Sequence, residues 1–203
     1  CIVQLEKQNE GSILYKGTNI DKLIAKDPLS YRKAVQMIFQ DPASALNPKM
    51  CIGHIFMEVM QVHQIGENTS ERKSRSIELL KKVGLDSEHF NRYPHEFSGG
   101  QKQRIGIARA LAVEPKILIC DESVSALDVS VQAQVLNLLN ELKESFSLSY
   151  IFISHDLSVV KHFCDRIVVL NNGIIEEIGF PEELFEGAKS NYTRKLIEAI
   201  PGI

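Results

Sequence analysis

Hydrophobic and polar positions along the chain follow two patterns, a helical repeat and short apolar runs. Apolar residues recur at helical spacing in four stretches that we expect to be helices, namely Ile52–Gln64, Ser70–Val83, the run from Ser98 to Ala112 and the run after Asp128. Ile117–Cys120 is wholly apolar, which suits a central parallel strand buried on both faces. Val35–Phe39 predicts a second strand, and Tyr150–Ile153 predicts another buried one.

The remaining segments are shorter or more polar. Asp21–Lys33 is predicted to be loop with one helical turn, and Asp86–Glu96 a polar loop in which His89 and His95 are exposed. Asn172-Gly173 is a strong hairpin signal between two strands, Arg166–Asn171 and Ile174–Ile178. Three further elements are expected: a short strand between Gly11 and Gly17 and helices over Leu157–Phe163 and Pro181–Phe185.

Size and composition narrow the class of protein. With 203 residues and 44% hydrophobic residues, the chain can form one well-packed core, with room for a sub-domain. A net charge of −3 gives no reason to expect a nucleic-acid binder. The four cysteines are scattered without a CxxC pair, so neither a zinc site nor a disulfide framework is indicated, and a reducing, cytoplasmic setting fits. No stretch has the roughly 20 apolar residues of a membrane span, so we expect a membrane role only through partner subunits.

Ser98-Gly99-Gly100-Gln101 opens the third helix. A serine followed three residues later by glutamine is a capping-box pattern. The two glycines leave the first turn without side chains, and a helix N-terminus attracts anions, phosphate above all. An ordinary helix start is the alternative, and for a lone SxxQ it is the better one.

Asp121 and Glu122 end the central apolar strand. Ligands of open α/β sheets bind beyond the carboxyl ends of the strands. Two adjacent carboxylates in such a place are costly unless a metal or a reaction uses them. The alternative, a solvated pair in a loop, is weakened by the expected burial of the strand.

Three more polar residues stand at the ends of predicted elements. Gln40 closes the Val35–Phe39 strand, and His155 follows the Tyr150–Ile153 strand. Taken alone, each would be a surface or turn residue. Asp128 is an apt N-cap for the helix that follows it, whose buried stripe is Val131, Val135, Leu138 and Leu142.

Together these motifs resemble those of ABC-type ATPases, in that family's order and at close to its usual separations. Residues 98–101 resemble the signature motif, with Phe97 where leucine is commoner. The run from Ile117 to Glu122 resembles the Walker B strand with its catalytic glutamate, and Ser125-Ala126-Leu127-Asp128 resembles the D-loop. Gln40 then matches the Q-loop glutamine, and His155 the switch histidine.

The resemblance implies a P-loop NTPase fold of the α/β class, with a mainly parallel sheet and an inserted helical sub-domain. It divides the chain into residues 1–42 of the catalytic sub-domain, a helical sub-domain over 43–113, a catalytic core over 114–180 and a C-terminal extension over 181–203. The phosphate-binding motif GxxxxGK[ST] does not occur in the 203 residues. We therefore expect the sequence to begin just after the Walker A helix; a natural half-site protein is the alternative.

The resemblance also implies roles. Glu122 and His155 would be catalytic, and Asp121 and Gln40 would bind Mg²⁺ beside ATP. Residues that would contact nucleotide are Gln40, Ser98, Gly99, Gly100, Gln101, Asp121 and Asp128. The signature residues would act in trans, on nucleotide held by a second ATPase subunit in a head-to-tail homodimer or heterodimer. Other implied partners are permease subunits and, indirectly, an extracytoplasmic peptide-binding protein, with the chain peripheral on the cytoplasmic face of the cell membrane and no nucleic acid bound.

Two segments indicate a subfamily. Gln40–Pro48 is close to the form seen in peptide-type importers, and Ser190–Leu196 resembles the start of their C-terminal extension. The implied function is ATP hydrolysis coupled to uptake of oligopeptides or dipeptides. The alternatives are an ABC importer ATPase for another solute (metal, sugar or amino acid) and a non-transport ABC ATPase.

Overall fold

The structure is a computed structural model that describes residues 1–41, 44–125 and 127–200. The chain forms two compact units, Cys1–Ile151 and Phe152–Ile203. Three parts of the predicted segments lie outside the described residues: Pro42 and Ala43 after Gln40, Ala126 of the D-loop-like motif, and residues 201–203. Among the described residues, no helix is both long enough and apolar enough to cross a membrane.

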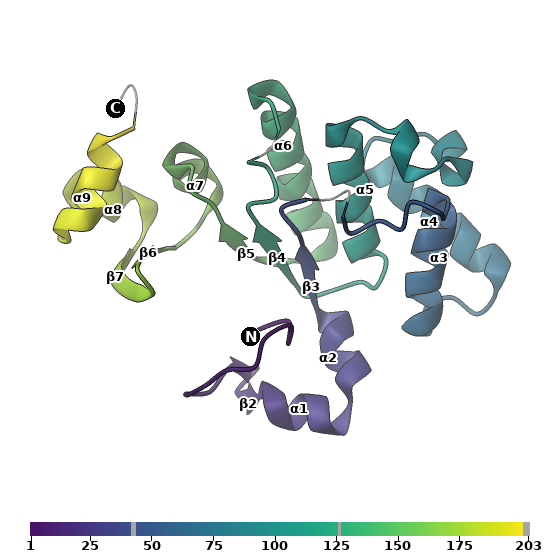
Figure 1. Cartoon of the computed structure of the whole chain (residues 1–203), viewed down its shortest axis with the longest axis horizontal. Helices are drawn as coiled ribbons and strands as arrows, with labels where there is room; N and C mark the ends of the chain where they lie inside the picture. Colours follow the sequence, from purple (N-terminus) through teal and green to yellow (C-terminus); the bar gives the residue numbers. More distant parts are fainter. Residues whose placement is uncertain (42–43, 126, 201–203) are drawn as a thin grey trace. The chain divides into compact units, whose positions relative to one another are not determined.

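The first unit contains most of the helices and most of the larger sheet (Figure 1). Its elements in chain order are β1 (Leu14–Tyr15), β2 (Thr18–Asn19), α1 (Ile20–Lys26), α2 (Pro28–Ala34), β3 (Val35–Ile38), α3 (Ile52–Val62), α4 (Thr69–Lys82), η1 (Ser87–Asn91), η2 (Pro94–Glu96), α5 (Gly99–Leu111), β4 (Ile117–Asp121), α6 (Val129–Phe146) and the beginning of β5 (Ser149–Ile153). The helices predicted from periodicity are confirmed as α3, α4, α5 and α6.

The larger sheet has the strand order β3-β4-β5. β3 and β4 are parallel, with a register that runs from Val35 opposite Ile117 to Ile38 opposite Cys120. Leu118 and Cys120 of β4 are fully buried, as expected for an apolar strand in the middle of a sheet. The predicted central parallel strand is therefore confirmed, and it brings the ends of β3 and β4 to the same edge.

The prediction of a loop over Asp21–Lys33 is wrong, because this segment forms two helices, α1 and α2. Each begins at a side-chain cap. The Asn19 side chain accepts a hydrogen bond from the Asp21 N–H, and the Asp27 side chain accepts one from the Ser30 N–H. Pro28 occupies the first turn of α2, where a missing N–H costs nothing. Asp27-Pro28 is thus a break between two helices.

The prediction that His89 is exposed is also wrong, whereas His95 is exposed as expected. Residues 86–96 form two 3₁₀ helices, η1 and η2, and His89 is only 9% exposed. Its Nδ1 accepts a hydrogen bond of 2.9 Å from the Asp86 N–H, and its ring lies edge-on to Phe97, 5.2 Å between centroids. The segment is polar in composition, yet it contains a buried histidine that packs against Phe97, the residue before the signature-like motif.

The third predicted strand, β5, is less buried than expected. Its residues alternate between exposed and half-buried, and Ile151 and Ile153 are 38% and 47% exposed. β5 lies at one end of the strand order of this sheet.

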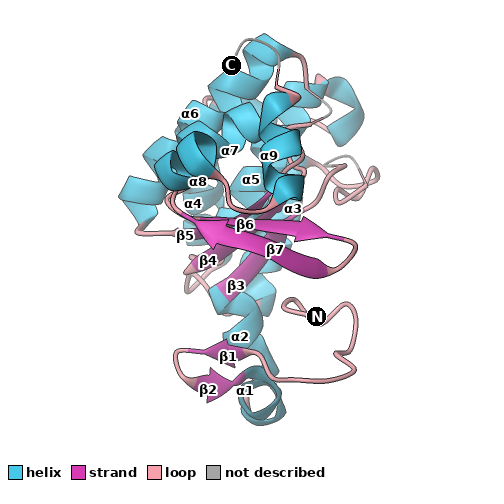
Figure 2. Cartoon of the chain, turned by 90° about the vertical axis from the view of Figure 1, so that its left-hand side faces the viewer, coloured by secondary structure: helices cyan, strands magenta, loops and turns pink. Residues whose placement is uncertain are grey.

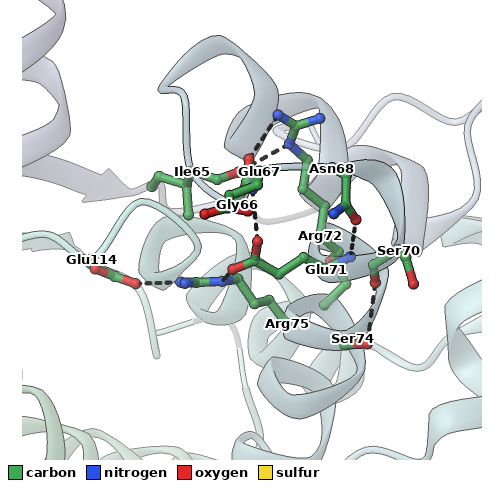
Figure 3. Close-up of polar contacts among 11 residues, drawn as sticks. Ile65, Gly66, Glu67, Asn68, Ser70, Glu71, Arg72, Ser74, Arg75 and Glu114 are labelled. Atoms are coloured by element: carbon green, nitrogen blue, oxygen red, sulfur yellow. Dashed lines mark hydrogen bonds and ion pairs between the residues drawn. The ribbon is translucent and has the colours of Figure 1, made fainter.

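A polar network ties α4 to its neighbours within the first unit (Figure 3). Arg75 contacts Glu71 and Glu114, each at 2.9 Å, and the Glu71 carboxylate also accepts a hydrogen bond from the Glu67 N–H. These bonds lower the pKa of Glu71, with the Glu67 N–H as the largest cause and Arg75 next. Glu114 lies between α5 and β4, so Arg75 links α4 to the segment that joins the signature-like helix to the central strand. The ion pairs are exposed, so we expect their effect on stability to be small.

The second unit is a β-hairpin covered by short helices (Figure 2). It contains the end of β5, α7 (Leu157–Phe163), β6 (Ile167–Asn171), β7 (Ile174–Gly179), α8 (Pro181–Gly187) and α9 (Asn191–Glu198). β6 and β7 are antiparallel and turn at Asn172 and Gly173, both with positive φ, which confirms the predicted hairpin. Four side chains form its core, namely Val160, Ile167, Val169 and Leu184.

Glu177 of β7 fixes the start of α9. Its carboxylate accepts hydrogen bonds from the Lys189 and Ser190 N–H groups, at 2.9 and 3.0 Å, and these lower its pKa. A carboxyl with a lowered pKa in the folded state stabilises the fold at neutral pH, and this contribution disappears as the pH falls through that pKa. Glu177→Gln should therefore lower the melting temperature at pH 7, and the gap to the wild type should narrow in acid. A gap that stays constant down to acidic pH in thermal melts would contradict this assignment.

Candidate active site

The centre of the candidate site is the turn that follows β4. Glu122, directly after the strand, has φ +45°, a left-handed conformation that is costly for a residue with a side chain. The Glu122 carbonyl accepts hydrogen bonds from the Ser125 N–H (3.1 Å) and the Ser125 hydroxyl (2.9 Å). These bonds hold Glu122 in a sparsely populated backbone conformation, and such strain gathers at functional sites.

Gln40 meets Glu122 at this turn. The Gln40 Nε2 donates a hydrogen bond of 2.7 Å to the Glu122 Oε2, across 82 residues of sequence. The sheet explains the contact, because parallel β3 and β4 place Ile38 opposite Cys120 and so bring the residues after each strand to one edge. Two of the predicted site residues are therefore together at this edge of the sheet.

Asp121 is the last residue of β4, directly before Glu122, and its side chain is half-buried. The Asp121 carboxylate and the Gln40 amide offer oxygen donors, the kind that Mg²⁺ prefers. Among the described residues, no group of three His, Cys, Asp or Glu side chains is placed to hold a metal ion. Mg²⁺ in nucleotide sites keeps several waters and takes one or two carboxylates plus substrate phosphates. The Asp121 carboxylate and the Gln40 amide oxygen are the residues that would hold Mg²⁺ if it binds here together with phosphates.

The signature-like turn has the predicted capping box. The Gln101 N–H donates to the Ser98 Oγ (3.3 Å), and the Ser98 N–H donates to the Gln101 Oε1 (3.0 Å). Ser98 and Gly99 are exposed, and a Cβ built on Gly99 would meet no atom within 4 Å. This turn therefore offers open backbone N–H groups at the N-terminus of a 13-residue helix.

Asp128 confirms its predicted capping role. Its Oδ1 accepts a hydrogen bond of 3.1 Å from the Val131 N–H at the start of α6. Asp128 is exposed, and the next residue, Val129, is 83% exposed. The predicted contact of Asp128 with nucleotide stays a prediction.

His155 belongs to the second unit. It lies in the turn between β5 and α7, it is exposed, and the residue after it, Asp156, caps α7 through the Ser158 and Val159 N–H groups at 3.0 and 3.3 Å. Its position is the one expected from sequence, after a strand and before a helix. Its predicted convergence with Gln40 and Glu122 stays a prediction.

Sequence patterns gave no sign of two buried polar side chains near these motifs. Gln103 in α5 is 1% exposed and Ser123, directly after Glu122, is 2% exposed. Among the described residues, neither the Gln103 Nε2 nor the Ser123 Oγ has a hydrogen-bond partner. The one available signal was their nearness in sequence to Gly100 and Glu122. A polar residue next to a motif is most often solvated, so this signal did not predict burial.

The chain matches a known family model and is similar to several known proteins. The family model for ABC transporters matches residues 1–125. The oligopeptide transport ATP-binding protein OppF of Bacillus subtilis is 49% identical over 98% of this chain and 66% of its own length. The OppF of Haemophilus influenzae is 50% identical over 99% of this chain and 60% of its own length. The dipeptide transport ATP-binding protein DppF of Lactococcus lactis is 47% identical over 94% of this chain and 61% of its own length.

Two solved structures share the fold. CbiO1 from Clostridium perfringens, part of the ABC transporter complex cbiONQ, has a TM-score of 0.78 at 27% identity and covers 98% of this chain and 77% of its own. The ATP-binding cassette MJ0796, solved as a dimer with ADP and Pi, has a TM-score of 0.75 at 28% identity, over 89% and 77% of the two chains. This chain spans less than two thirds of the length of its curated relatives, 60% to 66% for those named above. The matched family model, these relatives and the shared fold establish that the chain belongs to the ABC transporter family.

Proposed function

We propose that this protein is the ATP-hydrolysing subunit of an ABC importer and couples ATP binding and hydrolysis to uptake of oligopeptides or dipeptides. The observation that carries the ATPase proposal is the 2.7 Å hydrogen bond from Gln40 to Glu122 at the ends of two parallel strands. The peptide substrate rests on the relatives, which are named as oligopeptide and dipeptide transport ATP-binding proteins. The division into segments 1–42, 43–113, 114–180 and 181–203 belongs to the same proposal.

The chemistry follows from the residues at the strand ends. Glu122 takes a proton from the attacking water as the general base. Gln40 orients the Glu122 carboxylate through its amide N–H, and His155 holds the terminal phosphate. Asp121 and Gln40 are the ligands we assign to Mg²⁺, which when bound neutralises charge on the phosphates. Most of the rate enhancement in phosphoryl transfer comes from such positioning and charge stabilisation.

The remaining site residues act on a neighbouring subunit. The open turn at Ser98 and Gly99 is suited to receive phosphate oxygens of a nucleotide bound by a second ATPase subunit. Asp128 lies at the start of the next helix and completes this face. The subunit would work peripherally at the cytoplasmic face of the membrane, with permease subunits and, indirectly, an extracytoplasmic peptide-binding protein.

The 203-residue polypeptide by itself should hydrolyse ATP negligibly. It contains Asp121 and Glu122, but no GxxxxGK[ST] loop to hold the phosphates that they act on. A phosphate-release assay with the purified polypeptide checks this expectation. Steady turnover that disappears in Glu122→Gln would show that the expectation is wrong.

The transport function is tested in cells. Uptake of a labelled oligopeptide should require the full-length protein and should stop when it carries Glu122→Gln. Purification from solubilised membranes should recover permease subunits with it. Uptake of a metal, sugar or amino acid that stops in the variant, with peptide uptake unchanged, would instead support another importer, and recovery of ribosomes or DNA without permeases would support a non-transport ATPase.

A further inference from the structure

We propose that Val131 is a positioning residue that seats the signature turn, through Gly100, against the helix that follows the D-loop. The proposal rests on the proposed function, in which this turn acts on the nucleotide of a neighbouring subunit. It adds a residue outside the sequence motifs themselves, and it gives the two signature glycines different tasks.

The two glycines have different surroundings. A Cβ built on Gly99 would meet nothing within 4 Å, whereas a Cβ built on Gly100 would lie 2.5 Å from the Val131 Cγ1. A distance under about 3 Å is too short for two carbon atoms, whose optimal separation is about 3.5 to 4.0 Å. Gly100 has no positive φ, so the backbone itself does not demand glycine there. Gly100 is thus required by the close approach of α6, and Gly99 keeps the outer side of the turn open.

Val131 is itself held in place. Its N–H donates to Asp128, the last residue of the D-loop-like motif, at 3.1 Å. One turn further along α5, Arg104 donates to the Gln134 Oε1 of α6 at 3.3 Å and to the Val83 carbonyl at 2.9 Å. Gly100 and Arg104 are four residues apart on α5, and Val131 and Gln134 are three apart on α6, so both contacts lie along one shared seam.

The seam joins two elements that the proposed function assigns to the neighbouring subunit's site. Asp128 fixes Val131, and Val131 fixes the depth at which the first turn of α5 lies. A displacement of α6 at its N-terminus is therefore passed directly to the backbone N–H groups of Gly99 and Gly100 in the first turn of α5. The signature turn and the D-loop should move together and not independently.

A double-mutant cycle tests the contact. Gly100→Ala adds a methyl group that collides with Val131, and overpacking of this size should lower ATP turnover of the full-length protein about tenfold. Val131→Ala removes the colliding atoms, so Gly100→Ala with Val131→Ala should recover most of that loss. The melting temperature should follow the same cycle, with a loss of about 3 to 6 °C in Gly100→Ala that the second substitution restores.

Gly99→Ala is the matched control. Its methyl group meets no atom of its own subunit, so Val131→Ala should not restore whatever turnover Gly99→Ala loses. The proposal is overturned if Val131→Ala fails to rescue Gly100→Ala, or if it rescues Gly99→Ala equally well. Melting does not depend on ATP. If the double mutant recovers the melting temperature but the full-length wild type does not hydrolyse ATP, the proposed function is refuted and the contact between Gly100 and Val131 stands.

Discussion

Glu122→Gln in the full-length protein should lower ATP turnover by about two to four orders of magnitude, the range that a general base contributes. ATP binding should be unchanged. Glutamine keeps the shape of the side chain, and its carbonyl can still accept the hydrogen bond that the Gln40 Nε2 gives to Glu122. What it loses is the ability to take a proton from water. Single-turnover hydrolysis and equilibrium ATP binding, measured on the same preparation, separate these two effects.

Glu141→Gln is a matched control for this experiment, because Glu141 is an exposed glutamate of α6, outside the site. It should hydrolyse ATP at the wild-type rate. Undiminished hydrolysis by Glu122→Gln would remove Glu122 from its assigned role. Loss of ATP binding in that variant would mean that the residue holds nucleotide and does not activate water.

Gln40→Glu should give the second largest effect. It replaces the amide that donates to Glu122 at 2.7 Å with a carboxylate. Two carboxylates this close cannot both be ionised readily, so the pair should retain a proton to higher pH. The general base must be ionised to act, so turnover near neutral pH should fall about a hundredfold and recover in part as the pH rises. The pH profile of turnover is the measurement that checks it.

Gln40→Met separates charge from the loss of the hydrogen bond. Methionine has a similar length and no charge, but it lacks both the amide N–H that bonds Glu122 and the carbonyl oxygen assigned to Mg²⁺, so it should lower turnover by at least about tenfold, the cost of one hydrogen bond to a charged group. Its pH profile should keep the wild-type shape. If Gln40→Glu and Gln40→Met gave the same profile, the pairing of Gln40 with Glu122 would have no part in catalysis.

Much of the site could be predicted because its parts are encoded locally. The capping box at Ser98, the cap at Asp128 and the apolar run before Asp121 each depend on a few neighbouring residues, and all three are confirmed. The meeting of Gln40 and Glu122 depends on strand order. It was nevertheless foreseeable, since parallel strands present their carboxyl ends at one edge.

The failures have a common cause, which is that tertiary packing overrides local composition. α1 and α2 mix polar and apolar residues, and each begins at a side-chain cap, while Ile20 and Tyr31 anchor them in one buried cluster. His89 is buried because η1 packs against α3 and α4, which no local pattern encodes. The difference between Gly99 and Gly100 is likewise invisible in the sequence, because it depends on Val131, a residue some 30 positions away on another helix.

The most direct test is a structure of full-length Glu122→Gln with Mg²⁺ and ATP. We expect the terminal phosphate to lie within hydrogen-bond reach of Gln40, residue 122 and His155 of one subunit. We also expect the Ser98–Gly99 turn of a neighbouring subunit to close over that same phosphate. A nucleotide bound away from the ends of β3 and β4, or a Gly99 turn that contacts the nucleotide of its own subunit, would contradict the central claim.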